Sequence, residues 1–208
     1  MRPNDRHVVH GLTGGVGSGK SEILRYISAH YDARIIQADE VGRELMEPGR
    51  SVYRALVRAF GGEILGPDGR IDRPRFAALL FSNPEALRTA NEVEHPIIRA
   101  SIRMRIAHTK CRHIFLEAAL LLEGGLVPLC NDVIVAEADR EIRIRRLSES
   151  RGYSEEKSCA VMDGQLSDEA FLEIADHVID TSGSLPDTYE QVRTLMKKLK
   201  VPEKHDTV

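Results

Sequence analysis

Residues 14–21 read Gly-Gly-Val-Gly-Ser-Gly-Lys-Ser, which matches the pattern G-x-x-x-x-G-K-[ST]. A loop with this pattern surrounds a phosphate group with backbone N–H groups. Its surroundings fit as well, because Val8, Val9 and Leu12 form a β-prone run before it and apolar residues recur at helical spacing after it. The segment therefore predicts a strand, a phosphate-binding loop and a helix in succession, a unit that belongs to α/β folds.

The residue types of this loop suit the phosphates of a nucleotide. Glycines let the chain turn tightly and approach an anion closely, and the helix that follows presents N–H groups and its positive dipole end. We expect Lys20 to lie between the β- and γ-phosphates, and the hydroxyl of Ser21 to be a Mg²⁺ ligand. The N–H groups of Ser21 and Glu22 would reach toward the β- and α-phosphates. The expected nucleotide-binding residues are Gly14, Gly15, Val16, Gly17, Ser18, Gly19, Lys20, Ser21 and Glu22.

Composition narrows the class of protein. The 208 residues carry a net charge of −3, which supplies no basic footprint for nucleic acid. Cys111, Cys130 and Cys159 lack C-x-x-C spacing, so they indicate neither a disulfide framework nor a zinc site. The polar start of the chain does not read as a signal peptide, and no window approaches the ~20 apolar residues that span a bilayer. We expect a cytoplasmic protein without nucleic-acid or membrane partners, and a monomer for which weak self-association stays open.

Strand and helix signals alternate along the chain, as in a parallel sheet flanked by helices. Four β-prone runs follow the first, at 34–36, 114–116, 132–136 and 177–179. Between 51 and 107 the strand signals vanish and apolar residues recur at helical spacing. We therefore expect a nucleotide-binding core at 1–50, 108–140 and 174–208, a helical acceptor-binding region at 51–107 and a polar helical lid at 141–173.

Local signals mark the expected ends of helices. Asn83-Pro84 has the residue types of an N-cap followed by the first helical position. Pro96 should interrupt the helix that begins there, because proline removes a backbone donor. Ser184 and Asp187 have capping-box spacing before the last helix. The tail from Val201 is expected to fray.

A set of short segments follows the loop in a fixed order along the chain. The set comprises Gly11–Ser21, Ala38-Asp39, Glu47-Pro48-Gly49, Asp68-Gly69-Arg70-Ile71-Asp72-Arg73, His95-Pro96-Ile97-Ile98, Ala119-Leu120-Leu121-Leu122-Glu123, Arg146-Leu147, Gln165-Leu166-Ser167 and Ala175-Asp176-His177-Val178-Ile179-Asp180. In this order the segments resemble the dephospho-CoA kinase family, from Gly11 to about Leu199. The loop alone indicates only a phosphate-binding protein, whereas the ordered set is far more specific.

The resemblance implies a P-loop NTPase fold with a helical region for a CoA-like substrate and an arginine-bearing lid. The implied reaction, the last step of coenzyme A biosynthesis, uses ATP and Mg²⁺ to phosphorylate the ribose 3′-hydroxyl of dephospho-CoA, giving CoA and ADP. Among the lid arginines the resemblance selects Arg146, with Arg151 second, and it supports His95-Pro96 as part of the acceptor site. The chain departs from the family pattern at Gln37, Glu117, Ala119, Ser150 and Ser182, and Arg151 comes one residue later than the common spacing.

Two carboxylates are candidates for catalysis and metal binding. Asp39 follows the second expected strand, at the sheet edge that also carries the phosphate loop, so it can orient an acceptor hydroxyl and take its proton. The alternative for Asp39 is a helix N-cap. Glu117 ends the third expected strand and can hold Mg²⁺ through a water. The alternative for Glu117 is a structural pair with Lys20 or a backbone N–H.

Further candidates come from the lid, the helical region and the last strand. Five arginines lie at 140, 143, 145, 146 and 151, of which we expect three on a solvated helix face. Arg99 can meet a substrate phosphate, although surface exposure is the commoner fate, and His95 can be structural. Ser182-Gly183 follows the last strand, where it can border adenine through backbone atoms.

Three other functions stay open at this point. Another small-molecule kinase of the same fold would share the loop, and a panel of acceptors would distinguish it. A GTPase-like switch fits the D-x-x-G pattern at 39–42, but no N-K-x-D motif for guanine occurs in the chain. A non-catalytic CoA-binding relative is disfavoured by the presence of Lys20, Ser21, Asp39 and Arg146.

Overall fold

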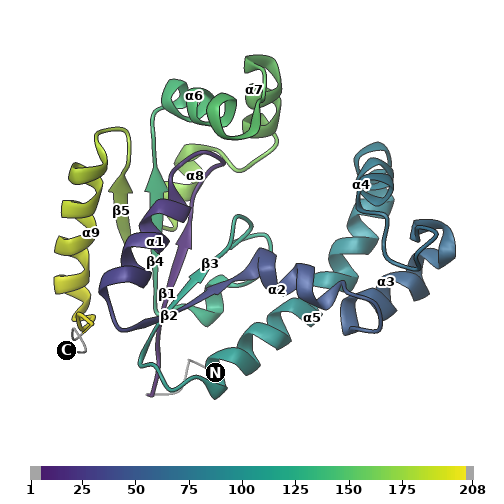
Figure 1. Cartoon of the computed structure of the whole chain (residues 1–208), viewed down its shortest axis with the longest axis horizontal. Coiled ribbons are helices and arrows are strands. Elements are labelled where there is room, and N and C mark those ends of the chain that lie inside the picture. The colour runs from purple at the N-terminus through teal and green to yellow at the C-terminus, as the bar shows by residue number, and fades with distance from the viewer. Residues whose placement is uncertain (1–5, 205–208) are drawn as a thin grey trace. The chain divides into compact units, whose positions relative to one another are not determined.

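The computed structural model describes residues 6–204. The described chain separates into two compact units, the first formed by residues 6–36 and 109–204 and the second by Gln37–His108. Residues 37–50, which the sequence interpretation grouped with the nucleotide core, belong to the second unit. Figure 1 shows the elements of both units along the chain.

A five-stranded sheet forms the centre of the first unit. Its strands are, in spatial order, β2 (Ala33–Gln37), β3 (His113–Glu117), β1 (Val8–Thr13), β4 (Asp132–Glu137) and β5 (His177–Asp180). β1 pairs in parallel with both β3 and β4, and β4 pairs in parallel with β5. Every residue of β3 is buried, which explains why this strand reads as an apolar run. The α/β class and the positions of all five expected strands are confirmed.

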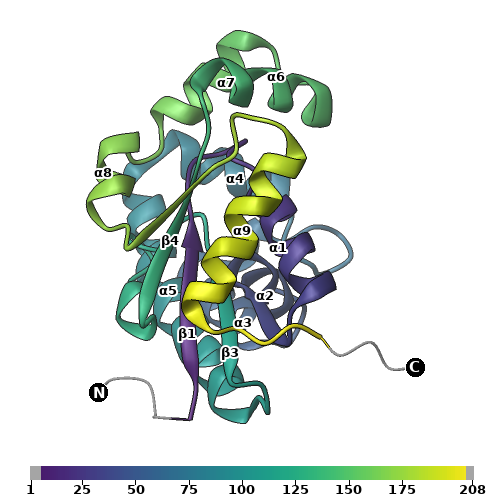
Figure 2. The same cartoon turned by 90° about the vertical axis from the view of Figure 1, so that its left-hand side faces the viewer.

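Two helices cover one face of this sheet. They are α1 (Lys20–His30) and α9 (Leu185–Leu199), which lie side by side in Figures 1 and 2. Ile23 and Ile27 of α1 and Val192 of α9 enter one hydrophobic core with strand residues such as Phe115. The predicted capping box opens α9, with Ser184 and Asp187 in both of its hydrogen bonds.

Three helices form the segment predicted as the lid. They are α6 (Arg140–Arg151), α7 (Glu155–Asp163) and α8 (Asp168–Glu173). Gly152 ends α6 with a φ of 64°, a left-handed value that glycine adopts without strain. Leu147 and Met162 form a small buried cluster with Val16 of the phosphate loop. The loop and the predicted lid therefore share one hydrophobic contact.

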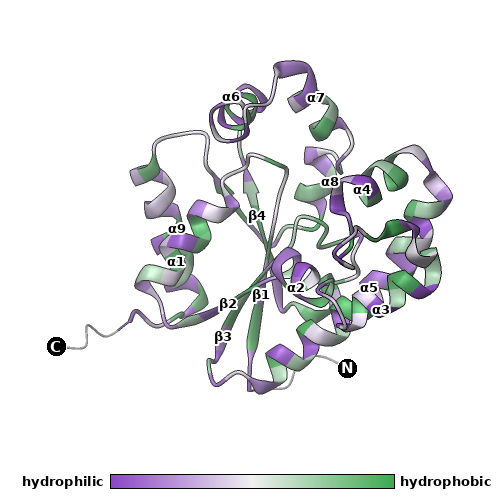
Figure 3. Cartoon of the chain, turned by 45° about the vertical axis from the view of Figure 1, so that its right-hand side comes forward, coloured by the Kyte–Doolittle hydropathy of each residue, from purple (hydrophilic) through white to green (hydrophobic). Residues whose placement is uncertain are grey.

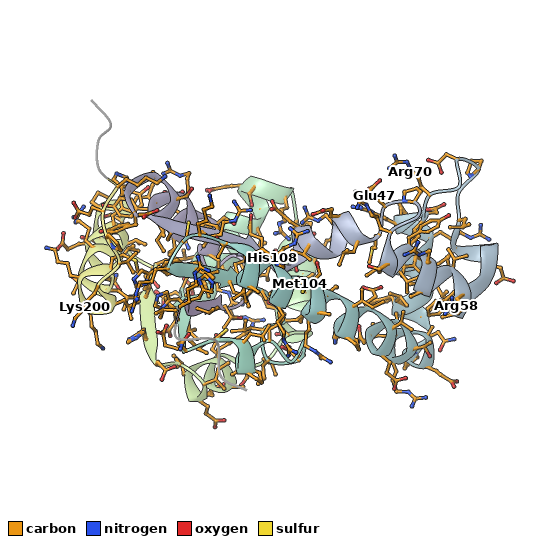
Figure 4. The ribbon with its side chains drawn as sticks, turned by 90° about the horizontal axis from the view of Figure 1, so that it is seen from below. Glu47, Arg58, Arg70, Met104, His108 and Lys200 are labelled. Carbon is orange, nitrogen blue, oxygen red and sulfur yellow. The ribbon has the colours of Figure 1, made fainter. Side chains whose placement is uncertain are left out.

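The second unit is helical, as expected from its sequence. It contains α2 (Ala38–Leu45), α3 (Ser51–Phe60), the 3₁₀ turn η1 (Gly61–Ile64), α4 (Arg73–Ser82) and α5 (Pro84–His108). Val52, Leu56 and Phe76 are among the buried residues of its core, and Figure 3 shows how apolar and polar residues alternate along these helices. An ion pair between Arg70 and Glu47, at 2.6 Å, joins two loops of this unit (Figure 4).

Pro96 does not interrupt its helix, so that prediction was wrong. α5 runs without a break through 25 residues, and Asn83 accepts hydrogen bonds from its first N–H groups as predicted. α5 packs against α2, α3 and α4, and this tertiary packing offsets the one hydrogen bond that proline removes.

No helix within residues 6–204 is both long and apolar enough to cross a membrane.

Residues 201–204, which follow α9, are not frayed. The expectation that the tail frays from Val201 was therefore wrong for these residues. Val201 is buried among α1 and α9 residues. The N–H of Asp32 donates to the carbonyl of Pro202, and the N–H of Lys204 donates to the carbonyl of His30, both at 2.8 Å. Backbone hydrogen bonds to the α1–β2 connection therefore hold residues 201–204.

Glu94 provides a test of packing in the second unit. Burial raises the pKa of this α5 carboxyl from 4.5 to about 7. Its protonated form therefore contributes stability that is complete below about pH 4.5 and is lost as pH rises through 7. We expect Glu94→Gln to match the native protein near pH 4.5 and to exceed its free energy of unfolding at pH 8 by at most about 3 kcal/mol. Urea unfolding at the two pH values measures this, and a pH-independent difference would contradict it.

Candidate active site

The phosphate loop joins β1 to α1 and depends on three glycines with positive φ. Gly14, Gly17 and Gly19 have φ values of 138°, 79° and 82°. A Cβ atom on Gly14 would lie 2.2 Å from the backbone oxygen of Ala136 in β4, and that oxygen belongs to a sheet strand that cannot move aside. The loop thus presses against the end of the sheet, which only glycine allows.

The ammonium group of Lys20 lies at this loop. Its Nζ donates to the carbonyl oxygens of Gly14 and Gly15, at 2.6 and 3.0 Å. The α1 N-terminus begins at the same residue and adds N–H groups that a helix cannot satisfy internally. An ammonium group and a helix N-terminus beside a glycine bend fit the phosphates of a nucleotide.

Glu22 was expected to contact a phosphate through its N–H, but in the structure its N–H and its carboxylate bind other protein groups. Its N–H donates to the carbonyl of Gly19 at 3.0 Å. Its carboxylate accepts hydrogen bonds from Arg25 in α1 and Tyr189 in α9. The hydrogen bond from Arg25 lowers the pKa of Glu22, so this carboxylate stays ionised while it joins the two helices. Contact of the Glu22 N–H with a phosphate stays a prediction.

Thr181 supports the loop from the end of β5, and sequence reasoning missed it. Its hydroxyl donates to the carbonyl of Ser18 at 3.0 Å, and the side chain is 2% exposed. A Cβ atom on Gly19 would approach the Thr181 hydroxyl to 3.1 Å. A lone threonine after a strand gives no signal in the sequence, because only the fold brings it to the loop.

Arg146, the lid arginine that the family resemblance selects, contacts the loop, and its role at the phosphates stays a prediction. Its guanidinium donates to the carbonyl and hydroxyl oxygens of Thr181, at 2.6 and 2.9 Å, and to the carbonyl of Gly17 at 3.3 Å. Arg151 is exposed, with its guanidinium 6.0 Å from the centre of the Tyr153 ring. Exposure of three lid arginines is confirmed, namely Arg140, Arg145 and Arg151.

Arg143 is the fifth arginine, and its role at the loop was missed. It is 4% exposed, and its Nε donates to the carbonyl of Val16 at 2.9 Å. Gln165, which follows α7, accepts a hydrogen bond from the N–H of Val16 at 2.7 Å. The sequence showed an arginine-rich helix, but which face of it turns inward depends on the packing of α6.

The predicted metal ligands are Glu117 at the end of β3 and Ser21 in α1. Glu117 is the last residue of β3, is 8% exposed and pairs in register with Leu12. Ser21 is exposed in the first turn of α1. Across residues 6–204, no three His, Cys, Asp or Glu side chains form a cluster that would hold a metal by themselves. One carboxylate with a hydroxyl fits Mg²⁺, which takes its other ligands from phosphates and water.

The predicted acceptor residues His95, Pro96 and Arg99 lie on one face of α5. They line a surface depression of about 540 Å³. Its other lining residues are Pro84, Leu87, Arg88, Asn91 and Glu92. The spacing of three and four residues along a helix brings these side chains to the same face.

Asp39 lies in α2 of the same unit. Gln37 is the N-cap of α2, so the alternative of Asp39 as that cap was wrong. Asp39 is exposed in the first turn of α2. α2 is tied to α5 by an ion pair between Glu44 and Arg105, at 2.6 Å.

Ser182 and Gly183 follow β5, as expected. The N–H of Ser182 donates to Asp180, and its hydroxyl accepts a hydrogen bond from the N–H of Asp139 at 2.9 Å. The Ser182 side chain thus joins the β5 end to the start of α6. Contact of Ser182 and Gly183 with adenine stays a prediction.

Gly14→Ala tests whether the glycine bend is required. The new methyl group would displace the loop from β4 and strain a positive φ, so we expect a loss of at least about 2 kcal/mol in the free energy of unfolding and weaker ATP binding. Gly62→Ala is the matched control, because a Cβ there meets no atom within 4 Å. Urea unfolding and calorimetric titration with ATP measure the effect. Equal behaviour of the two variants would contradict the argument.

Comparison with known proteins assigns this chain to a family. The family model of dephospho-CoA kinase matches residues 8–187. A dephospho-CoA kinase from Streptomyces avermitilis is 38% identical over 183 residues, covering 88% of this chain and 89% of that protein. One from Corynebacterium diphtheriae is 40% identical over 177 residues, covering 84% and 88%. A solved Thermus thermophilus protein superposes with a TM-score of 0.81 at 28% identity, covering 93% of this chain and 98% of its own. The chain belongs to the dephospho-CoA kinase family of ATP-dependent kinases with the P-loop fold.

Proposed function

We propose that the protein transfers the γ-phosphoryl group of ATP to the ribose 3′-hydroxyl of 3′-dephospho-CoA, giving CoA and ADP. The observation that carries the proposal is the glycine bend with Lys20 held at its carbonyls, in a chain of this family. We also propose that the protein acts in the cytoplasm as a monomer, with ATP and Mg²⁺. The division into core (1–50, 108–140, 174–208), acceptor region (51–107) and lid (141–173) belongs to the same proposal, except that residues 37–50 pack with the acceptor region.

The donor side of the reaction is assigned to the loop and the lid. The loop N–H groups and Lys20 neutralise charge on the transferring group, which is the main demand that phosphoryl transfer makes on a protein. Arg146 contributes positive charge from α6, and Arg151 is the second candidate. Ser21 and Glu117 would hold Mg²⁺, which when bound offsets charge on the β- and γ-phosphates.

The acceptor side is assigned to the second unit. Asp39 orients the 3′-hydroxyl and takes its proton, a role that suits an exposed carboxylate near the start of a helix. His95, Pro96 and Arg99 bind the acceptor along α5, where they share one depression. The guanidinium of Arg99 suits a phosphate oxygen of the substrate.

Lys20→Ala tests the donor side. Loss of the ammonium removes charge stabilisation in the transition state, so we expect kcat to fall by about a hundredfold or more. ADP release, measured with ATP, Mg²⁺ and dephospho-CoA, gives the rate.

The choice of acceptor is tested with the native protein, for which a nucleoside, a nucleotide and a sugar acid serve as alternative acceptors. Faster transfer to one of them than to dephospho-CoA would reject the proposed acceptor.

Asp39→Asn tests the acceptor side. The amide cannot take the proton of the hydroxyl, so turnover should fall by about a hundredfold or more while ATP affinity stays unchanged. Glu40→Gln is the control, because it removes an exposed carboxylate one position along the same helix. Turnover by Asp39→Asn at the level of Glu40→Gln would eliminate the proposed role.

A further inference from the structure

Side chains of the predicted lid bind both backbone polar groups of Val16. The N–H of Val16 donates to Gln165 Oε1 at 2.7 Å, and its carbonyl accepts from Arg143 Nε at 2.9 Å. The Val16 side chain is 9% exposed and packs with Leu147 and Met162. Val16 is thus held by the lid through its N–H, its carbonyl and its side chain.

The Arg143 guanidinium fits a space that the loop glycines leave open. A Cβ atom on Gly15 would lie 2.1 Å from Nη2 of Arg143, and one on Gly17 would lie 3.2 Å from the Arg143 Cβ. Nη1 pairs with Asp168 Oδ1 at 2.8 Å, at the start of α8. A buried guanidinium requires such partners, because an uncompensated charge in the interior is costly. Arg143 therefore links the loop to both α6 and α8.

The two peptide groups that flank Val16 are oriented in opposite senses. In a trans peptide the C=O and N–H point in opposite directions. In the first peptide group, the Gly15 carbonyl accepts from Lys20 while the Val16 N–H faces Gln165. In the second, the Val16 carbonyl faces Arg143, so the Gly17 N–H points away from the lid. Gln165 therefore acts on the side of the first peptide group opposite to Lys20, and Arg143 acts on the side of the second opposite to the Gly17 N–H.

We propose that Arg143 and Gln165 are positioning residues for phosphoryl transfer. By holding the two peptide groups at Val16, they direct the Gly17 N–H to the side of the loop on which Lys20 lies, where the phosphates are proposed to bind. The inference rests on the proposed function, since it takes ATP as the phosphoryl donor. A hydrogen-bond donor that points the wrong way reduces stabilisation of the transition state more than it reduces binding of the nucleotide. The loss should therefore appear in kcat.

The experiment compares Gln165→Met and Arg143→Met with Arg140→Met. Arg140 is an exposed arginine of the same helix, paired with Asp163 at 2.9 Å, and serves as the matched control. We expect kcat to fall about tenfold or more in the first two variants, with KM for ATP changed less than about threefold. Arg140→Met should stay within about twofold of the native protein.

A second readout needs no turnover and does not require Arg143→Met to fold. Hydrogen exchange of the Val16 amide, followed by NMR, should quicken about tenfold or more in Gln165→Met, because its acceptor is gone. Gln165→Met leaves no charged group without its partner, whereas Arg143→Met removes the partner of Asp168. If Arg143→Met does not fold, Gln165→Met alone tests the proposal.

Two outcomes would overturn the inference. One is a kcat for Gln165→Met equal to that of Arg140→Met, or a loss that appears only in KM for ATP. The other is an unchanged exchange rate for the Val16 amide. Failure of the proposed function is distinguishable, because the native protein would then phosphorylate a different acceptor. The same variants compared on that acceptor would still decide the role of Arg143 and Gln165.

Discussion

Contact between the phosphate loop and the end of the sheet is the constraint on which this structure depends. Gly14 lies so close to the Ala136 carbonyl of β4 that no side chain fits between them, and Thr181 supports the loop at Ser18. The backbone can follow this path only through three residues with positive φ. Because the path is held by the sheet, Lys20 and the α1 N-terminus keep their place at the bend. The chemistry of the family needs this fixed arrangement of donors more than it needs any covalent step.

Arginines on one short helix serve different purposes. Arg140 and Arg145 are exposed, whereas Arg143 is buried against Val16 and Arg146 bonds to Thr181 and Gly17. A residue type that is usually solvated becomes part of the interior when carbonyl oxygens and a carboxylate satisfy its N–H groups. The phosphate loop is thus supported by the sheet and by the predicted lid, and its geometry depends on both.

Prediction from sequence succeeded where local physics decides. The five strands, the Asn83 cap and the Ser184 capping box follow from residue patterns a few positions long. It failed at Pro96 and at the tail after Val201, where packing and distant backbone partners outweigh local preference. The Glu94 carboxyl illustrates the same limit, since its raised pKa is caused by burial that no local pattern reveals.

The sequence by itself determined the α/β class, the phosphate loop with Lys20 and the family, because each is carried by a contiguous motif or by the order of motifs. Only the tertiary structure decided that Thr181, Arg143 and Gln165 meet at the loop. These residues are far from it along the chain, and each forms its hydrogen bond because a strand end or a helix face is packed there. Contacts between distant segments depend on how whole elements pack, and residue spacing does not encode that packing.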